Sequence, residues 1–212
     1  MLYKIFMENF IKKYNVSRET LEKLSRFIDI LRAWQAKMNL VSNNSLGEIW
    51  TRHIADSFQL YQYLNSDAKT IYDIGSGAGF PAIVLAIASL VDNRPTNFTL
   101  IESITKKTLY LNDVKNALDL KNVQILNARS ENLKLSAADF ITARAVANLN
   151  KLFGLSYPLI NKNTVLIFPK GKSFEQELAD AEKNWRFDVD IKANEIEQEG
   201  VVLIISNLRK KR

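Results

Sequence analysis

The chain has 212 residues, of which 47% are hydrophobic and 25% charged, as is typical of one globular domain or of a domain with an extension. It contains no cysteine and a single histidine, which excludes disulfides, cysteine nucleophiles and metal sites built from cysteine or several histidines, and we expect no metal. The net charge of +6 permits a polyanionic partner without requiring one.

Apolar residues at helical spacing predict two helices at the beginning of the chain. Leu2 and Phe10 belong to the apolar face of the first helix, and a stripe from Leu21 to Met38 belongs to the second. Ser17 stands where a hydroxyl group caps the start of the second helix. Both stripes are expected to be buried in the core.

A third helix is predicted after a polar loop. Ser45, with Glu48 three residues later, has the pattern of a capping box, and the helix is expected to run to about Leu64. The periodicity changes after the polar segment that follows this helix. We therefore expect a helical extension over residues 1–66 and a second domain over residues 67–212.

Short apolar strands alternate with helices in this second domain. The expected strands cover residues 70–74, 98–102, 123–126, 139–142, 164–168, 187–191 and 201–206. The expected helices cover residues 83–90, 105–117, 149–157 and 174–185. This alternation predicts an α/β fold with a mostly parallel, seven-stranded sheet covered on both faces. The last two strands follow each other without a helix, so we expect an antiparallel strand at one edge of the sheet.

A glycine cluster, Gly75-Ser76-Gly77-Ala78-Gly79, follows the first expected strand. Ligands bind beyond the carboxyl ends of strands in open parallel sheets, and glycine lets the backbone approach a ligand closely. The dinucleotide pattern G-x-G-x-x-G fits poorly, because its last position is Phe80 when counted from Gly75 and Ala82 when counted from Gly77. The case for NAD as the ligand is therefore weak, but NAD is not excluded. With Asp73 in the preceding strand, the loop resembles the S-adenosylmethionine loop of Rossmann-like methyltransferases.

Two further strand ends carry candidate cofactor contacts. Glu102 ends the second expected strand, where a carboxylate can accept hydrogen bonds from both ribose hydroxyl groups. The third strand leads to Arg129-Ser130-Glu131, a short polar loop in which Ser130 and Glu131 are candidates to hold an adenine. Together with the glycine loop, these residues predict a nucleoside-containing ligand.

Several motifs together resemble a known family. They are Asn39-Leu40-Val41-Ser42, Arg52-His53-Ile54-Ala55-Asp56-Ser57, the segment from Asp73 to Pro81, the segment from Thr142 to Ala147, and Phe168-Pro169-Lys170-Gly171. The combination resembles the bacterial small-subunit rRNA guanine-N7 methyltransferases, the RsmG or glucose-inhibited division protein B family. One departure is Gln35, where the family usually has asparagine.

The resemblance implies S-adenosylmethionine as cofactor and a guanine of 16S rRNA, near the ribosomal decoding region, as methyl acceptor. It also implies a cofactor site at Gly75, Phe80, Glu102, Ser130, Glu131 and Arg144. The implied partner is 16S rRNA or the small ribosomal subunit. The second-ranked possibilities are a methyltransferase for a small molecule or protein, and an RNA-binding factor without enzymatic activity.

Guanine N7 carries an in-plane lone pair and no proton, so its methylation needs no general base, and we assign no acid or base. Catalysis then depends on placing N7 in line with the methyl carbon. Arg144, after the fourth expected strand, and Lys170, after the fifth, are candidate contacts to the transition state, to guanine O6 or to RNA phosphates. Arg129 is a further candidate for RNA binding.

His53 and Asp56 lie three residues apart and so share one face of the expected third helix. A general base is one interpretation of this pair. We favour a hydrogen-bonded cluster that joins the helical extension to the sheet. No apolar run approaches the ~18 residues that span a bilayer, and the first residues do not have the pattern of a secretion signal, so we expect the protein in the cytoplasm. We also expect a monomer.

Overall fold

The computed structural model describes residues 2–212, with side chains from Ile5 onward, so the Leu2 side chain lies outside the described part. Within it, seven strands form one sheet in the order β3-β2-β1-β4-β5-β7-β6. The strands are β1 (Thr70–Ile74), β2 (Asn97–Glu102), β3 (Val123–Asn127), β4 (Phe140–Thr142), β5 (Val165–Lys170), β6 (Trp185–Ala193) and β7 (Val201–Lys210). β1 to β5 are parallel, and β7 pairs antiparallel with both β5 and the edge strand β6. The mixed sheet expected from the sequence is confirmed.

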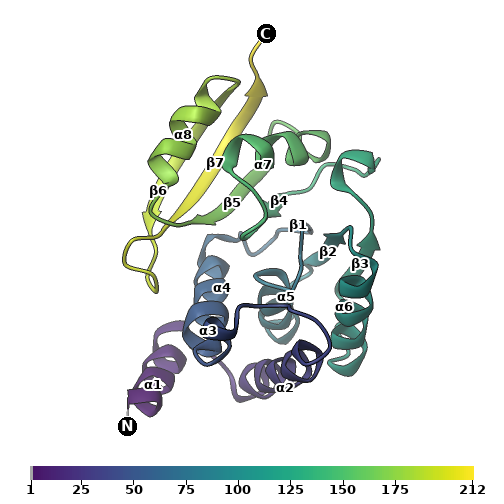
Figure 1. Ribbon diagram of the computed structural model, residues 1–212, viewed down its shortest axis with the longest axis vertical. Helices are drawn as coiled ribbons and strands as arrows, with labels where there is room; N and C mark the ends of the chain where they lie inside the picture. The colour runs from purple at the N-terminus through teal and green to yellow at the C-terminus, as the bar shows by residue number, and fades with distance from the viewer. Residues whose placement is uncertain (1) are drawn as a thin grey trace.

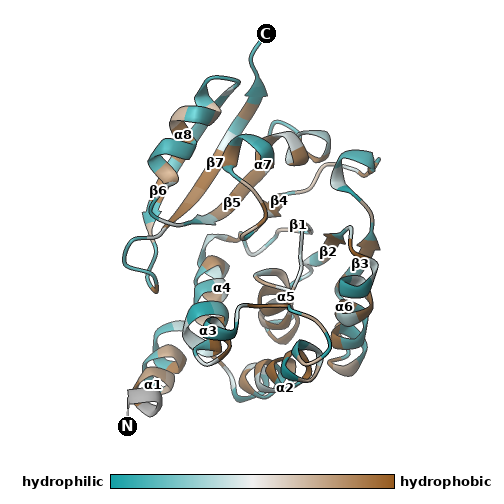
Figure 2. Cartoon of the chain, viewed as in Figure 1, coloured by the Kyte–Doolittle hydropathy of each residue, from teal (hydrophilic) through white to brown (hydrophobic). Residues whose placement is uncertain are grey.

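Helices cover both faces of this sheet and bury its side chains in two clusters (Figure 1). The helices that follow strands are α5 (Ala82–Val91), α6 (Thr105–Ala117), α7 (Leu149–Ser156) and α8 (Phe174–Glu182). Along β1, Ile71 faces the cluster with α5 and α6, while Tyr72 and Ile74 face the cluster with α7. Figure 2 shows hydrophobic residues concentrated in the central strands and α5, as a sheet buried on both faces requires.

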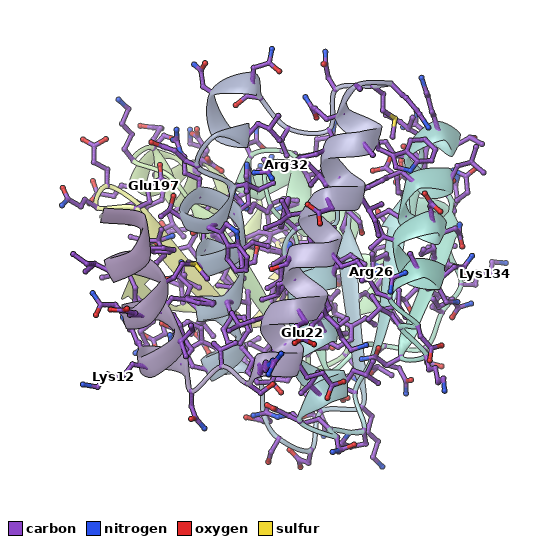
Figure 3. The ribbon with its side chains drawn as sticks, turned by 90° about the horizontal axis from the view of Figure 1, so that it is seen from below. Lys12, Glu22, Arg26, Arg32, Lys134 and Glu197 are labelled. Carbon is purple, nitrogen blue, oxygen red and sulfur yellow. The ribbon has the colours of Figure 1, made fainter. Side chains whose placement is uncertain are left out.

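Two N-terminal helices contribute buried residues to the same core cluster as α5. They are α1 (Leu2–Tyr14) and α2 (Arg18–Gln35), and the predicted cap is confirmed, because the backbone N–H of Thr20 donates to Ser17 Oγ at 3.1 Å. Leu24 and Phe27 of α2 are fully buried, whereas the charged side chains labelled on this helix in Figure 3 lie on its outer face. The boundary at residue 66 stays a prediction.

The predicted single helix from Ser45 to Leu64 is wrong. The segment forms α3 (Asn43–Leu46), a π-helical turn η1 (Trp50–Ala55), α4 (Asp56–Phe58) and a 3-10 turn η2 (Gln59–Tyr63). Ser42 caps α3 in place of Ser45, accepting a hydrogen bond from the Ser45 N–H at 3.3 Å. Ile49 and Ile54 are both buried although they stand five positions apart, a spacing that a wider π turn accommodates better than an α-helix.

No helix among residues 2–212 is both long and apolar enough to cross a membrane. The last two strands are longer than the sequence predicted, and β7 ends far from α1, so the two ends of the chain lie at opposite ends of the molecule (Figure 1).

Candidate functional site

The centre of the sheet contains a point at which the chain reverses its direction of winding. From β1 the chain goes outward to β2 and β3, and β4 then returns to the other side of β1. The loops that leave β1 and β4 therefore diverge, which opens a crevice at the carboxyl ends of these strands. A cavity of about 810 Å³ lies there, and four residues predicted from the sequence line it, namely Gly75, Gly77, Phe80 and Arg144.

The glycine loop has a backbone that residues with side chains rarely adopt. Gly75, Gly77 and Gly79 have φ angles of +67°, +50° and +89°. A Cβ atom on Gly75 would lie 2.7 Å from Val146 Cγ2, and one on Gly79 would lie 2.7 Å from Ile83 Cγ1. The loop therefore needs glycine both for its conformation and for its close packing. It presents bare backbone to the cavity.

The side chain of Glu102 holds the glycine loop in place through a backbone hydrogen bond. Its carboxylate accepts hydrogen bonds from the N–H of Gly77 at 2.9 Å and from the N–H of Ile104 at 2.8 Å, and the residue is 5% exposed. Two of the roughly four acceptor positions of the carboxylate are thus in use, which leaves capacity for further donors. Glu102 lies against the glycine loop but is not among the residues that line the cavity, so its assignment to ribose hydroxyl groups stays a prediction.

Asp73 lies under the loop and is 1% exposed. Thr142 donates a hydrogen bond to Asp73 Oδ1 at 2.7 Å, and the Ser76 hydroxyl group donates to the backbone carbonyl of Asp73 at 3.1 Å. Burial raises the pKa of Asp73 to about 7, and the hydroxyl groups of Ser76 and Thr142 beside the carboxyl group oppose the rise. Asp73 does not line the cavity, so its observed contacts link β1 to β4 and to the start of the loop.

Arg144 connects the loop after β4 to the N-terminal segment. Its Nε lies 3.2 Å from Asp56 Oδ2, and its Nη2 donates to the backbone carbonyl of Arg52 at 2.7 Å. Asp56 also accepts hydrogen bonds from Gln59 at 2.9 Å and Asn194 at 2.7 Å. The expected hydrogen-bonded cluster is confirmed for Asp56, which ties α4 to β4 and to the turn after β6.

The same expectation is wrong for His53. Both of its ring nitrogens are buried, and no described residue lies within hydrogen-bonding reach of either. Its ring stacks on Phe80 with centroids 4.8 Å apart and planes inclined by 18°. Burial, together with the nearby charges of Arg144 and Arg52, lowers the pKa of His53 to about 3. His53 is therefore a neutral wall of the cavity at pH 7.

Replacing His53 with phenylalanine is expected to raise the free energy of unfolding at pH 7 by about 1 kcal/mol, because the stacking on Phe80 remains while two unpartnered nitrogens disappear. Unfolded histidine binds a proton near pH 6.5, but the folded residue does so only near pH 3. The wild type should therefore lose stability relative to the variant as the pH falls from 6.5 toward 3. Urea titrations at several pH values measure this, and a pH-independent difference would contradict it.

The loop after β3 lies away from the cavity. Ser130 is 4% exposed and begins the 3-10 turn η3 (Ser130–Asn132), while Arg129 is exposed with its Nη1 4.0 Å from Glu131 Oε1. Lys134, in the same loop, lies on the opposite side of the molecule from Glu197, which lines the cavity (Figure 3). The register pairs Glu102 with Asn127, so this loop lies next to the loop that leaves β2 and one strand further out than the glycine loop.

Lys170 is engaged with its own neighbours. Its Nζ donates to the backbone carbonyl of Ala147 at 2.9 Å and lies 2.7 Å from Glu177 Oε2. The residue lines a second, smaller cavity of about 330 Å³, and Arg144 lines both cavities. The observed partners join β5 to α8 and to the loop before α7. A role in RNA binding stays a prediction.

Two parts of the cavity wall were not assigned from the sequence. One is the loop before α3, including Leu40 and Val41, and the other is the turn of residues 196–199 between β6 and β7. Gln35 holds the first, since its Oε1 accepts from the Leu40 N–H at 2.8 Å and its Nε2 donates to the Val41 carbonyl at 2.9 Å. The motif Asn39–Ser42 was a signal for this loop, whereas nothing local indicated the turn.

Among the described residues, no group of three or more His, Asp and Glu side chains is arranged to hold a metal ion. The main cavity is instead lined by the glycine loop together with many polar and charged side chains, among them Glu48, Arg52 and Lys107.

Comparison with known proteins identifies the family and shows which solved structures share the fold. The profile of the family described as "GidB: rRNA small subunit methyltransferase G" matches residues 20–201. The chain is 36% identical to the ribosomal RNA small subunit methyltransferase G of Cereibacter sphaeroides, over 96% of this chain and 98% of that protein. It is 40% identical to the protein of the same name from Brucella anthropi, over 92% of each chain.

Solved structures share the fold at low sequence identity. An O-methyltransferase from Bacillus cereus in complex with SAH superposes with a TM-score of 0.60 at 13% identity, covering 95% of this chain and 97% of that one. A SAM-dependent methyltransferase from Aquifex aeolicus has a TM-score of 0.56 at 16% identity, covering 75% of this chain and 92% of that one. The extent of the family match and the identity to the relatives show that the chain belongs to the rRNA small subunit methyltransferase G family.

Proposed function

We propose that the protein transfers a methyl group from S-adenosylmethionine to N7 of a guanine in 16S rRNA of the small ribosomal subunit. The observation that carries the proposal is the glycine loop at the β1–β4 crevice, which has no room for a side chain at Gly75 or Gly79 and opens into a cavity of about 810 Å³. That volume lies in the range that encloses a ligand of this size. Membership of the methyltransferase family gives the reaction class.

The residues around the crevice suit this cofactor. Gly75 and Gly77 offer bare backbone, and Glu102 retains acceptor capacity for ribose hydroxyl groups beside them. Ser130 and Glu131, in the loop next to Glu102 in the sheet, are proposed to contact the adenine. When bound, S-adenosylmethionine supplies an electrophilic methyl carbon attached to a positively charged sulfur.

The remaining wall is proposed to position the substrate base. Arg144 has one nitrogen, Nη1, that is buried without a hydrogen-bond partner among the described residues, and we assign it to guanine O6 or to the cofactor. His53 does not hold a proton at neutral pH, because its pKa is about 3. This agrees with a methyl acceptor that has no proton to remove, so the protein contributes placement and charge stabilisation.

The proposed substrate is RNA with its target base unstacked, since an A-form major groove hides N7 from side chains. We propose that the reaction takes place in the cytoplasm, where small subunits are assembled. A monomeric state stays a prediction, which analytical ultracentrifugation of the purified protein tests.

The test is transfer of a labelled methyl group to small ribosomal subunits and to naked 16S rRNA, followed by digestion and separation of nucleosides. We expect label in 7-methylguanosine. Label in N6-methyladenosine, or on a metabolite in a nuclease-treated reaction, would overturn the proposal. Calorimetry with S-adenosylhomocysteine separates a methyltransferase from an RNA-binding factor, because an RNA-binding factor that only shares the fold would not bind it.

A further inference from the structure

A further hollow lies at the open end of the β6–β7 hairpin, where β6 begins and β7 ends, away from the crevice. Its volume is about 690 Å³. Five basic residues from two strands and the end of the chain line it, namely Arg186, Arg209, Lys210, Lys211 and Arg212. The acidic residue of the lining, Asp188, already accepts a hydrogen bond from Asn207 at 2.6 Å. The hollow therefore has a strong excess of positive charge.

The sheet register places like charges opposite each other in this hollow. Arg186 is the cross-strand partner of Arg209, and Lys210 is the next residue along β7. Like charges directly opposite in an antiparallel pair repel each other. Within the described part of the chain, no ion pair involves Arg186, Arg209, Lys210 or Arg212. Such an arrangement is relieved when an anion lies between the side chains.

We propose that this hollow, the hairpin groove, binds phosphate groups of folded RNA at a distance from the methylated base. The inference rests on the proposed function, because it adds a second contact to the same RNA substrate. Arginine guanidinium groups are suited to phosphate oxygens, and the cross-strand pair Arg186 and Arg209 presents two of them on one face of the hairpin, with Lys210, Lys211 and Arg212 adding positive charge beside them. The groove is not part of the cofactor site.

The distance between the two sites determines what kind of partner reaches both. The turn of residues 196–199 lines the cavity at one end of β7, and the groove lies at the other end (Figure 1). Ten residues of strand span roughly 30 Å. A nucleotide or a metabolite cannot reach both sites, whereas a folded RNA or an assembled subunit can. The groove thus predicts a preference for structured RNA.

A membrane surface is the less suitable partner. Amphipathic membrane contacts combine cations with exposed apolar side chains that insert below the headgroups. The aromatic ring in the groove, Phe187, packs against Phe153 with centroids 4.9 Å apart and belongs to the edge of the core. It is therefore held by the protein and not free to insert.

The test neutralises the groove without touching the crevice, in the variant Arg186→Gln, Arg209→Gln, Lys210→Gln, Arg212→Gln. Lys211 is kept, because it donates to the backbone carbonyl of Glu182. The matched control removes four scattered exposed lysines, Lys12, Lys134, Lys151 and Lys162, and changes the net charge equally. Lys12 and Lys134 lie on well-separated sides of the molecule (Figure 3).

We expect the groove variant to raise the KM for small subunits by at least tenfold at moderate salt, with unchanged kcat and unchanged affinity for S-adenosylhomocysteine. The dependence of log(kcat/KM) on log(salt) should become shallower by about 3, since each lost phosphate contact removes about 0.7–0.9. The control should change both quantities much less. Equal effects in the two variants, or loss of binding to phosphatidylserine vesicles without any change in KM, would overturn the proposal.

A separate binding experiment tells failure of the proposed function apart from failure of the groove proposal. If the wild type methylates no RNA, fluorescence anisotropy with labelled 16S rRNA still compares wild type, groove variant and control. A weaker affinity of the groove variant alone would support the groove even then, and equal affinities would reject it.

Discussion

Replacing Arg144 with alanine is expected to reduce methyl transfer by at least 100-fold and to lower the free energy of unfolding by about 3 kcal/mol. The stability loss has a specific cause. The guanidinium lies 3.2 Å from Asp56, and the two side chains are 19% and 6% exposed. Removing one partner leaves the other charge buried without its counter-ion. Urea denaturation and a methyl-transfer assay measure the two effects.

A second substitution separates the two effects. In the double variant Arg144→Ala, Asp56→Asn, the buried charge is gone, and the asparagine oxygen still accepts from Gln59 and Asn194. We expect this variant to regain most of the lost stability and none of the activity. Near-wild-type turnover in Arg144→Ala would remove Arg144 from the proposed site, and recovery of activity with stability would show that its role is structural.

Replacing Gly75 with alanine is expected to weaken binding of S-adenosylhomocysteine by at least tenfold and to destabilise the fold by about 2 kcal/mol. The φ angle of +67° costs about 1 kcal/mol for a residue with a side chain. The new Cβ would also lie 2.7 Å from Val146 Cγ2. Val146 is an exposed side chain, so it can move, but it directly follows Arg144 and Ala145, which line the cavity, so a shift of this segment disturbs the site.

The controls for this prediction are another glycine and a second-site change. A Cβ atom added to Gly154, in α7, would have no neighbour within 4 Å, so Gly154→Ala should stabilise the helix by about 0.5–1 kcal/mol and leave ligand binding unchanged. Val146→Ala in the Gly75→Ala background should relieve the steric part and leave the backbone strain. Calorimetry checks both, and unchanged affinity in Gly75→Ala would show that the loop does not hold the cofactor.

Local patterns in the sequence were enough to predict most of the fold. Each strand and the helix after it depend on residues close together in the chain, so their periodicity can be read directly. The glycine loop was predicted because three glycines within five residues follow a strand, and the cap at Ser17 because it lies next to the helix it caps. The third helix was predicted wrongly, since burial of Ile49 and Ile54 depends on the core and not on local spacing.

The sequence by itself therefore determined the order of strands and helices, the family motifs and the position of the glycine loop. The tertiary structure decided which polar groups meet there. It paired Asp56 with Arg144, engaged Lys170 with Glu177, and left His53 stacked and without a hydrogen-bond partner among the described residues. The pairing of Asp56 with Arg144 and the stacking of His53 on Phe80 join segments far apart in the chain, and these partners are set by the crossover connections of the sheet, which no local pattern records.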